Sequence, residues 1–200
     1  MEIVIATRNK GKIREIREAL NAEGIVFRTF EELEDWPETK ETGDTLEENA
    51  LIKAFVLRNK YNLPAFADDS GLMVDKLDGR PGVCSSRYAG PEGDPDRNMD
   101  RLLEELRGVP DSERTARFMS VVALAIPGGG VHVTNGECDG VILEERKGKG
   151  GFGYDPIFQP SGYDRSMAEL SLAEKNAISH RGKALRAMKE ILDQMASDPR

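Results

Sequence analysis

The sequence predicts an α/β fold in which helices flank a mixed β-sheet, in two lobes with a cleft between them. Strand and helix patterns alternate early in the chain, whereas hairpin patterns dominate the middle. The chain has 200 residues, of which 38% are hydrophobic and 32% charged, as is typical of a globular protein with a sizeable core. We therefore expect residues 1–200 to form a single domain built from two lobes.

Runs rich in β-branched or apolar residues, bounded by turn residues, predict the strands. The predicted strands are residues 2–7, 25–29, 65–67, 72–74, 118–126, 131–133 and 138–143. A Pro-Gly-Gly-Gly sequence between the fifth and sixth strands predicts a hairpin. The acidic segment 31–44 and the segment 75–93, which is rich in glycine, proline and serine, predict surface loops.

Apolar residues at helical spacing predict the helices. The first helix has Ile13, Ile16 and Leu20 on one face, and Gly24 is a suitable stop signal. Start signals precede the others, namely capping boxes at Thr45–Glu48 and Ser171–Glu174 and an N-cap followed by proline at Asp94–Pro95. We expect the C-terminal helix to break between residues 179 and 182.

The charge and the cysteines exclude several classes of protein. A net charge of −8 disfavours broad binding to nucleic acid or to anionic membranes, because both need a basic surface. No apolar run approaches the roughly 18 residues that span a bilayer, and the first residues lack a signal-peptide pattern. A cytosolic protein is expected. The two cysteines form no CxxC pair, which predicts free thiols and no cysteine-based metal site.

The predicted loop between the first strand and the first helix is a candidate anion site. It contains Thr7, Arg8, Asn9, Lys10, Gly11 and Lys12. Backbone amides at a helix N-terminus favour an anion, the lysines add charge, and a glycine allows a phosphate to approach closely. An ordinary strand-to-helix turn with solvated lysines explains the same residues, so both interpretations stay open. The loop lacks the GxxxxGK[ST] pattern of a Walker A motif.

A second glycine-rich loop spans residues 148–153 and formally matches GxGxxG. A dinucleotide fingerprint must open a helix, whereas Pro156 and its aromatic neighbours favour extended chain, so we reject that interpretation. Phe152 could stack on a planar base, and Asp155 could accept a hydrogen bond from a base or ribose. A core aromatic residue in a tight loop is the competing explanation.

Hydrogen-bond donors gather near the C-terminus, at Lys175, Ser179, His180 and Arg181. They could grip carbonyl oxygens or phosphates. A solvated helix face is the simpler explanation when these residues are considered alone.

Two adjacent carboxylates, Asp68 and Asp69, follow the predicted strand at residues 65–67. Successive strand residues point to opposite faces, so one carboxylate can enter a cleft while the other bonds elsewhere. Asp-Asp-Ser-Gly is also good turn composition. Glu41 supplies a further carboxylate, and Mg²⁺ commonly takes one or two protein carboxylates together with phosphate oxygens and water. The pattern therefore predicts a Mg²⁺ site at Glu41 and one aspartate, and makes zinc improbable.

Six short motifs occur in one order and spacing over nearly the whole chain. They are Ala6-Thr-x-Asn-x-Gly-Lys12, Glu41-Thr-Gly43, Glu48-Asn-Ala50 with Lys53, Ala67-Asp-Asp-Ser-Gly-Leu72, Gly150-Gly-Phe-Gly-Tyr-Asp-Pro156 and Ser179-His-Arg-Gly182. Together they resemble the inosine/xanthosine triphosphate pyrophosphatases, which hydrolyse non-standard purine nucleoside triphosphates. Each motif alone is weak, but six in order are specific.

The resemblance implies a set of roles. Lys53 and the residues from Thr7 to Lys12 would hold the triphosphate. Glu41 and Asp69 would bind Mg²⁺, Asp69 would also accept the proton of the attacking water, and Ser70 would touch the substrate. The base pocket would comprise Phe152, Gly153, Tyr154, Asp155, Lys175, His180 and Arg181. An elongated two-lobed fold and a homodimer are further implications.

The implied reaction converts a nucleoside triphosphate and water into a monophosphate and pyrophosphate. Asp69 would have to bind the metal and also accept a proton. As a hypothesis, a water-mediated contact between Asp69 and the metal would allow both roles. Selectivity should depend on purine position 6, where hypoxanthine and xanthine present an acceptor and adenine a donor. The alternatives are a non-catalytic nucleotide-binding regulatory module, a pyrophosphatase for other modified nucleotides, and an RNA-binding protein, which the net charge disfavours.

Overall fold

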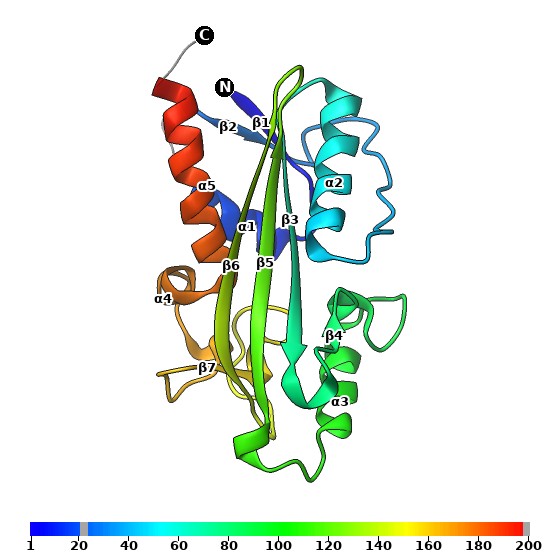
Figure 1. The fold of residues 1–200 in the computed structure, drawn as a ribbon, viewed down its shortest axis with the longest axis vertical. Coiled ribbons are helices and arrows are strands. Elements are labelled where there is room, and N and C mark those ends of the chain that lie inside the picture. The colour runs from blue at the N-terminus through cyan, green and yellow to red at the C-terminus, as the bar shows by residue number, and fades with distance from the viewer. Residues whose placement is uncertain (21–23, 198–200) are drawn as a thin grey trace. The chain divides into compact units, whose positions relative to one another are not determined.

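A computed structural model describes residues 1–20 and 24–197. The described residues form a seven-stranded sheet in the order β2-β1-β3-β5-β6-β7, with β4 paired to β3, and helices accompany it (Figure 1). The strands are β1 (Glu2–Ile5), β2 (Val26–Arg28), β3 (Ala65–Val74), β4 (Pro81–Gly82), β5 (Thr115–Ala125), β6 (Val131–Ile142) and β7 (Phe158–Pro160). The α-helices are α1 (Lys10–Ala19), α2 (Leu46–Tyr61), α3 (Pro95–Glu105), α4 (Leu172–Ile178) and α5 (His180–Ser197).

The sheet is mixed, which confirms the predicted fold class. Strand β1 runs parallel to both β2 and β3, whereas β3 pairs antiparallel with β4 and β6 antiparallel with β7. The parallel strands are connected through helices, as the geometry of a parallel crossover requires.

The chain divides into two compact units. Unit 1 contains Met1–Asp69, Ser120–Gly136 and the chain from Arg181 onward, and unit 2 contains Ser70–Met119 and Glu137–His180. The predicted cleft between two lobes stays a prediction.

Unit 1 has a core in which α1 and α5 pack against β1, β3 and β5. Its buried members are Ile3, Ile5, Ile16, Leu20, Phe66, Val122, Leu124, Ala184, Leu185, Met188 and Leu192. On α5, Leu185, Met188 and Leu192 recur at helical spacing and form the face that packs. Figure 1 shows α2 and α5 on opposite sides of the strands, and Ala50, Ala54 and Leu57 of α2 are buried as well.

Unit 2 has its own core. It is formed by the end of β3, the start of β5 and the end of β6, together with α3 and the segment that leads to α4. It is assembled from Leu72, Val74, Leu77, Tyr88, Met99, Leu102, Leu106, Ala116, Phe118, Cys138, Ile142, Tyr154, Ile157, Phe158 and Met167. The predicted N-cap of α3 is confirmed, since the Asp94 side chain accepts hydrogen bonds from two backbone amides of the first turn.

The two short strands predicted around the Asp-Asp-Ser-Gly sequence are one continuous strand. Strand β3 runs through residues 68–71 without a turn. Its first half pairs with β1, and its second half pairs with β4 in the register Leu72 to Gly82. Pairing at both ends overrides the local turn preference. Strand β6 likewise spans both segments predicted at residues 131–133 and 138–143.

Other boundaries differ from the predictions. Helix α1 begins at Lys10, because the Asn9 side chain caps its N-terminus, and it ends at Ala19, before Gly24. Residues 155–157 form a 3₁₀ turn, and the chain is extended only from Phe158. The predicted break at Ser179 is confirmed, although residues 180–182 already belong to α5.

Segment 75–93 is not wholly a surface loop. It contains β4, and both Ser85 and Tyr88 are buried. The Ser85 hydroxyl accepts a hydrogen bond from the Leu72 amide at 2.9 Å and donates to the Gly82 carbonyl at 2.6 Å. These bonds attach the segment to β3.

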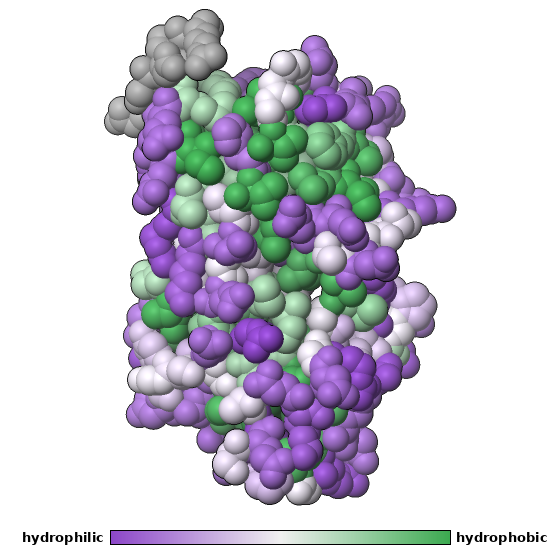
Figure 2. Space-filling model, viewed as in Figure 1, coloured by the Kyte–Doolittle hydropathy of each residue, from purple (hydrophilic) through white to green (hydrophobic). Residues whose placement is uncertain are grey.

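The surface of unit 1 carries exposed apolar side chains. Figure 2 shows hydrophobic residues gathered where α2 and the ends of β5 and β6 lie in Figure 1, and Val131 and Val133 on β6 are among the exposed ones. Within the described ranges, no helix has the length and apolar character needed to cross a bilayer. Both cysteines are thiols, with Cys84 exposed and Cys138 buried.

Candidate active site

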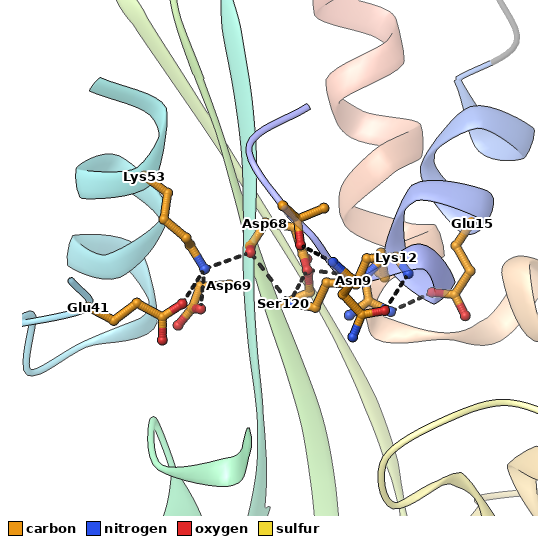
Figure 3. Close-up of polar contacts among 10 residues, drawn as sticks. Asn9, Lys12, Glu15, Glu41, Lys53, Asp68, Asp69 and Ser120 are labelled. Carbon is orange, nitrogen blue, oxygen red and sulfur yellow. Dashed lines mark hydrogen bonds and ion pairs between the residues drawn. The ribbon is translucent and has the colours of Figure 1, made fainter. Parts of the chain in front are cut away.

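The carboxylates of Asp68 and Asp69 lie on opposite sides of β3 (Figure 3). The strand is continuous, so successive side chains alternate between its faces, as predicted. Asp69 pairs with Lys53 of α2, whereas Asp68 contacts side chains from α1, β5 and α5. The two neighbours therefore take part in different sets of interactions.

On the Asp69 side, two carboxylates converge on one ammonium group. Lys53 Nζ lies 2.5 Å from Asp69 Oδ1 and 3.2 Å from Glu41 Oε1 (Figure 3). Lys53 also donates to the backbone carbonyl of Asp68 at 2.9 Å. Glu41 and Asp69 are distant in sequence, yet the fold places them side by side, as the predicted metal site requires.

The start of α2 holds the Glu41 loop in place. The predicted capping box is present, with the Thr45 hydroxyl accepting from the Glu48 amide and the Glu48 carboxylate accepting from the Thr45 amide. Asn49, one residue further on, accepts from the Gly43 amide at 2.8 Å and donates to the Gly43 carbonyl. Local hydrogen bonds thus fix the path of the chain just after Glu41.

Burial and neighbouring charges shift the pKa values of Asp69 and Lys53. Burial raises the pKa of Asp69, although Lys53 and Lys12 act in the opposite direction. Burial lowers the pKa of Lys53, but the neighbouring carboxylates of Asp69 and Glu41 outweigh it, so the net shift of that pKa is upward. A carboxylate with a raised pKa holds a proton more readily, which suits a proton acceptor.

On the Asp68 side, a buried network links two acids and two bases. Asp68 Oδ2 lies 2.7 Å from Lys12 Nζ and 3.2 Å from Arg181 Nε, and Asp68 Oδ1 accepts from the Ser120 hydroxyl. Arg181 Nη1 donates to Glu15. Burial opposes ionisation of Asp68, but Arg181 and Lys12 lower its pKa well below the usual range. Asp68 is therefore held as a carboxylate.

Side chains of the N-terminal loop accept hydrogen bonds from backbone amides at the start of α1. The Asn9 carboxamide oxygen accepts from the Lys12 amide at 3.1 Å, and the Thr7 hydroxyl accepts from the Asn9 amide at 3.1 Å. Lys10 pairs with Glu31 on the surface at 2.8 Å. Contrary to the predicted loop, residues 10–12 form the first helical turn, and the amides at a helix N-terminus favour an anion.

A separate cluster occupies unit 2. Asp155 Oδ2 accepts from Lys175 Nζ at 2.6 Å and from the Phe152 amide at 2.8 Å, and Lys175 Nζ lies 4.5 Å from the centroid of the Phe152 ring. Gly151 has φ +70°, and a Cβ there would fall 2.1 Å from Asp155 Oδ2, so this position requires glycine. The cluster places a half-buried aromatic ring beside a buried cation.

The C-terminal donors are not a solvated helix face. The side chains of Lys175, His180 and Arg181 are all buried. The His180 ring stacks on Phe118 with 4.7 Å between centroids and 14° between planes. Arg181 belongs to the Asp68 network of unit 1, whereas Lys175 and His180 belong to unit 2.

The remaining predicted site residues occupy varied environments. Arg8 is exposed, and Gly11, Ser70 and Gly153 are half-buried. Tyr154 is buried, and its hydroxyl donates to the Ser85 carbonyl at 2.8 Å, which gives it a structural contact.

Glu15 and Ser120 were missed from the sequence, although a signal existed for both. Glu15 stands next to Ile16 on the buried face of α1, and Ser120 falls in a period-two series of buried strand residues. Polar residues at core-facing positions need partners when buried, so each could have been suspected.

The donor set fits a hard divalent cation. Glu41 and Asp69 offer carboxylate oxygens that already converge on the cationic Lys53, and Mg²⁺ typically takes only one or two protein carboxylates. Across residues 1–20 and 24–197, no group of three or more His, Cys, Asp or Glu side chains could hold a metal. A zinc-type ligand set is therefore absent from the described part of the chain.

Comparison with known proteins decides the family. The sequence profile of the Ham1 family matches residues 3–191. The chain belongs to the Ham1 family. It is 52% identical over 190 residues to the dITP/XTP pyrophosphatase of Geobacter sulfurreducens, covering 95% of this chain and 96% of that relative. It is 47% identical over 195 residues to the dITP/XTP pyrophosphatase of Bacillus cereus, covering 96% and 95%.

Solved structures agree with this assignment. A HAM1 protein from Coxiella burnetii shares 42% identity with this Ham1-family chain at a TM-score of 0.88, covering 97% of this chain and 99% of that one. The Ham1 protein of Staphylococcus aureus shares 36% identity at a TM-score of 0.86, with the same coverage. The resemblance inferred from the six motifs is thus confirmed.

Proposed function

We propose that this Ham1-family chain hydrolyses non-standard purine nucleoside triphosphates (dITP, ITP and XTP) to the monophosphate and pyrophosphate, cleansing the nucleotide pool. The observation that carries this proposal is the convergence of Glu41 and Asp69 on Lys53, in a chain whose relatives are named dITP/XTP pyrophosphatases. A carboxylate with a raised pKa, a second carboxylate and a lysine are suited to moving a proton beside phosphate charge.

Water attacks the α-phosphorus, and the bond from that phosphorus to the oxygen bridging to the β-phosphorus breaks, so that pyrophosphate leaves. Asp69 takes the proton of the attacking water. The amides and side chains of residues 7–12, together with Lys53, hold the triphosphate and offset the charge that develops on the leaving group.

We assign Mg²⁺ as the cofactor, with Glu41 and Asp69 as the residues that would hold it. When bound, it supplies positive charge beside the phosphate oxygens. Binding of the metal requires Lys53 to share the two carboxylates with it, and Lys53 keeps a further acceptor at the Asp68 carbonyl.

The base is proposed to bind at Phe152, Gly153, Tyr154, Asp155, Lys175 and His180, with Ser70 touching the substrate. Arg181, which the resemblance also assigns to the base pocket, is left out of this proposal because its side chain is only 2% exposed and pairs with Asp68 and Glu15. The ring of Phe152 offers a stacking surface, and Lys175 offers a donor held in place by Asp155. An oxygen at purine position 6 would accept a hydrogen bond from such a donor, whereas the adenine amino group is itself a donor and would not.

Replacing Lys175 by methionine is expected to lower the preference for dITP over dATP, measured as the ratio of kcat/KM values, by about 10- to 100-fold, because one charged hydrogen bond to the base is lost. Methionine keeps a similar apolar stem in the buried position. Steady-state pyrophosphate release with both substrates measures the ratio. An unchanged ratio would remove Lys175 from the base pocket.

The decisive experiment for the proposed function is a substrate panel. Pyrophosphate release is measured with ITP, dITP, XTP, GTP and ATP, each with and without Mg²⁺. The expected result is metal-dependent release from the first three and little from GTP or ATP. Nucleotide binding without release would instead indicate a regulatory module, and activity on other modified nucleotides would indicate a different pyrophosphatase.

We further propose a homodimer that works in the cytoplasm and does not bind nucleic acid. The exposed apolar side chains on β6, including Val131 and Val133, are compatible with burial between two copies. The net charge of −8 supports the absence of nucleic-acid binding.

A further inference from the structure

We propose that Asp68, which the predicted site does not include, is a positioning residue that holds the ammonium groups of Lys12 and Lys53 ready for the substrate's phosphates. This inference rests on the proposed function. The lysines come from different helices, α1 and α2, and one residue of β3 contacts both (Figure 3).

Asp68 uses its carboxylate and its backbone carbonyl for this purpose. The carboxylate lies 2.7 Å from Lys12 Nζ, and the carbonyl accepts from Lys53 at 2.9 Å and from Lys12 at 3.4 Å. A lysine side chain has many rotamers, and a ligand that orders it must otherwise overcome the loss of that conformational entropy. Two lysines that are already ordered bind phosphate at a lower entropic cost.

The partners of Asp68 hold it rigidly from behind. Arg181 and the Ser120 hydroxyl contact its two carboxylate oxygens, and Glu15 contacts Arg181 in turn. The four charged groups, two acids and two bases, balance within the network. A balanced, fully hydrogen-bonded network can stay buried and keep one geometry.

Accessibility changes from one end of this network to the other. The side chain of Arg181 is only 2% exposed, whereas those of Lys12 and Lys53 are 15% and 11% exposed. An ammonium group has three donors, so Lys12 keeps donor capacity beyond its contacts with Asp68. The buried Arg181 therefore fixes the position of Asp68, and the two lysines that contact Asp68 are partly accessible to a ligand.

The test uses the full-length protein and inorganic pyrophosphate as the probe, with the dissociation constant measured by calorimetry in the presence of Mg²⁺. Asp68→Asn is expected to weaken pyrophosphate binding by about 10-fold and to raise KM for dITP similarly, with a smaller change in kcat, because Lys12 loses its charged partner. In a Lys12→Met background, Asp68→Asn should then have almost no further effect, because the lysine that the carboxylate positions is gone and the backbone carbonyl that holds Lys53 is unchanged by the substitution.

Glu15→Gln is the matched control. It disturbs the same buried network at Arg181 but touches neither lysine, so the loss of pyrophosphate affinity should be clearly smaller than in Asp68→Asn. Equal losses in Asp68→Asn and Glu15→Gln, or fully additive effects of Asp68→Asn and Lys12→Met, would overturn the proposal and leave Asp68 a merely structural residue.

Ser120→Ala keeps the test decisive if Asp68→Asn does not fold. Removing the hydroxyl that contacts Asp68 should weaken pyrophosphate binding by a few fold. This loss should appear only when Lys12 is present. An unchanged affinity in Ser120→Ala overturns the proposal. Wild-type protein that binds pyrophosphate but hydrolyses no triphosphate would refute the proposed function while these comparisons still decide the role of Asp68. Wild-type protein that does not bind pyrophosphate overturns the role of Asp68 directly.

Discussion

Replacing Asp69 by asparagine is expected to lower kcat for dITP by about 10²–10⁴-fold, the range attributed to a positioned general base. Asparagine matches the size of aspartate and can still accept a hydrogen bond from Lys53, but it cannot take a proton from water. Substrate binding should therefore survive. Pyrophosphate release under steady-state conditions gives kcat, and calorimetry with the monophosphate product checks that binding persists.

Asp75→Asn is a suitable control for the Asp69 variant. Asp75 follows the other end of the same strand, is exposed, and accepts from Thr115 at 2.7 Å. Its substitution should leave turnover near the wild-type value. Full turnover in Asp69→Asn would eliminate Asp69 as the proton acceptor, and a comparable loss in Asp75→Asn would point to a general effect on the fold.

Replacing Arg181 by methionine is expected to lower the free energy of unfolding by about 3–5 kcal/mol, the typical cost of removing one partner from a buried ion pair. The guanidinium contacts both Asp68 and Glu15, and these side chains are almost completely buried. Methionine fills much of the volume but leaves the Glu15 carboxylate buried without that charge. Urea denaturation at neutral pH measures the change.

Two further variants test the Arg181 prediction. Arg117→Met removes an arginine that pairs with Asp75 at 3.4 Å on the surface, and such pairs contribute about 0–1 kcal/mol. Adding Glu15→Gln to Arg181→Met should recover part of the lost stability, because the uncompensated carboxylate is removed as well. A cost for Arg181→Met no larger than that of Arg117→Met would show that the network contributes little to stability.

Features that depend on neighbours along the chain could be predicted from the sequence. The capping boxes at Thr45–Glu48 and Ser171–Glu174 are present, as is the N-cap at Asp94. In each, a side chain bonds an amide two or three residues away, so the whole interaction lies within one short segment. The family could also be predicted, because six short motifs retain their order.

The candidate site was predicted in part. Alternation along a strand predicted that Asp68 and Asp69 would face apart, and the pairing of Glu41 with Asp69 followed from the family resemblance. The partners of Asp68 did not follow, because Glu15, Ser120 and Arg181 come from three elements that are far apart in sequence.

The starts of α2, α3 and α4 and the residue types needed for phosphate chemistry could be predicted from the sequence alone, because they depend on local spacing. The straight path of β3 through Asp-Asp-Ser-Gly and the burial of Arg181 between two carboxylates could not be predicted from local sequence. Both depend on strand pairing and buried ion pairs, which join groups that come together only in the complete fold. Their combined free energy exceeds the weak turn preference of four residues.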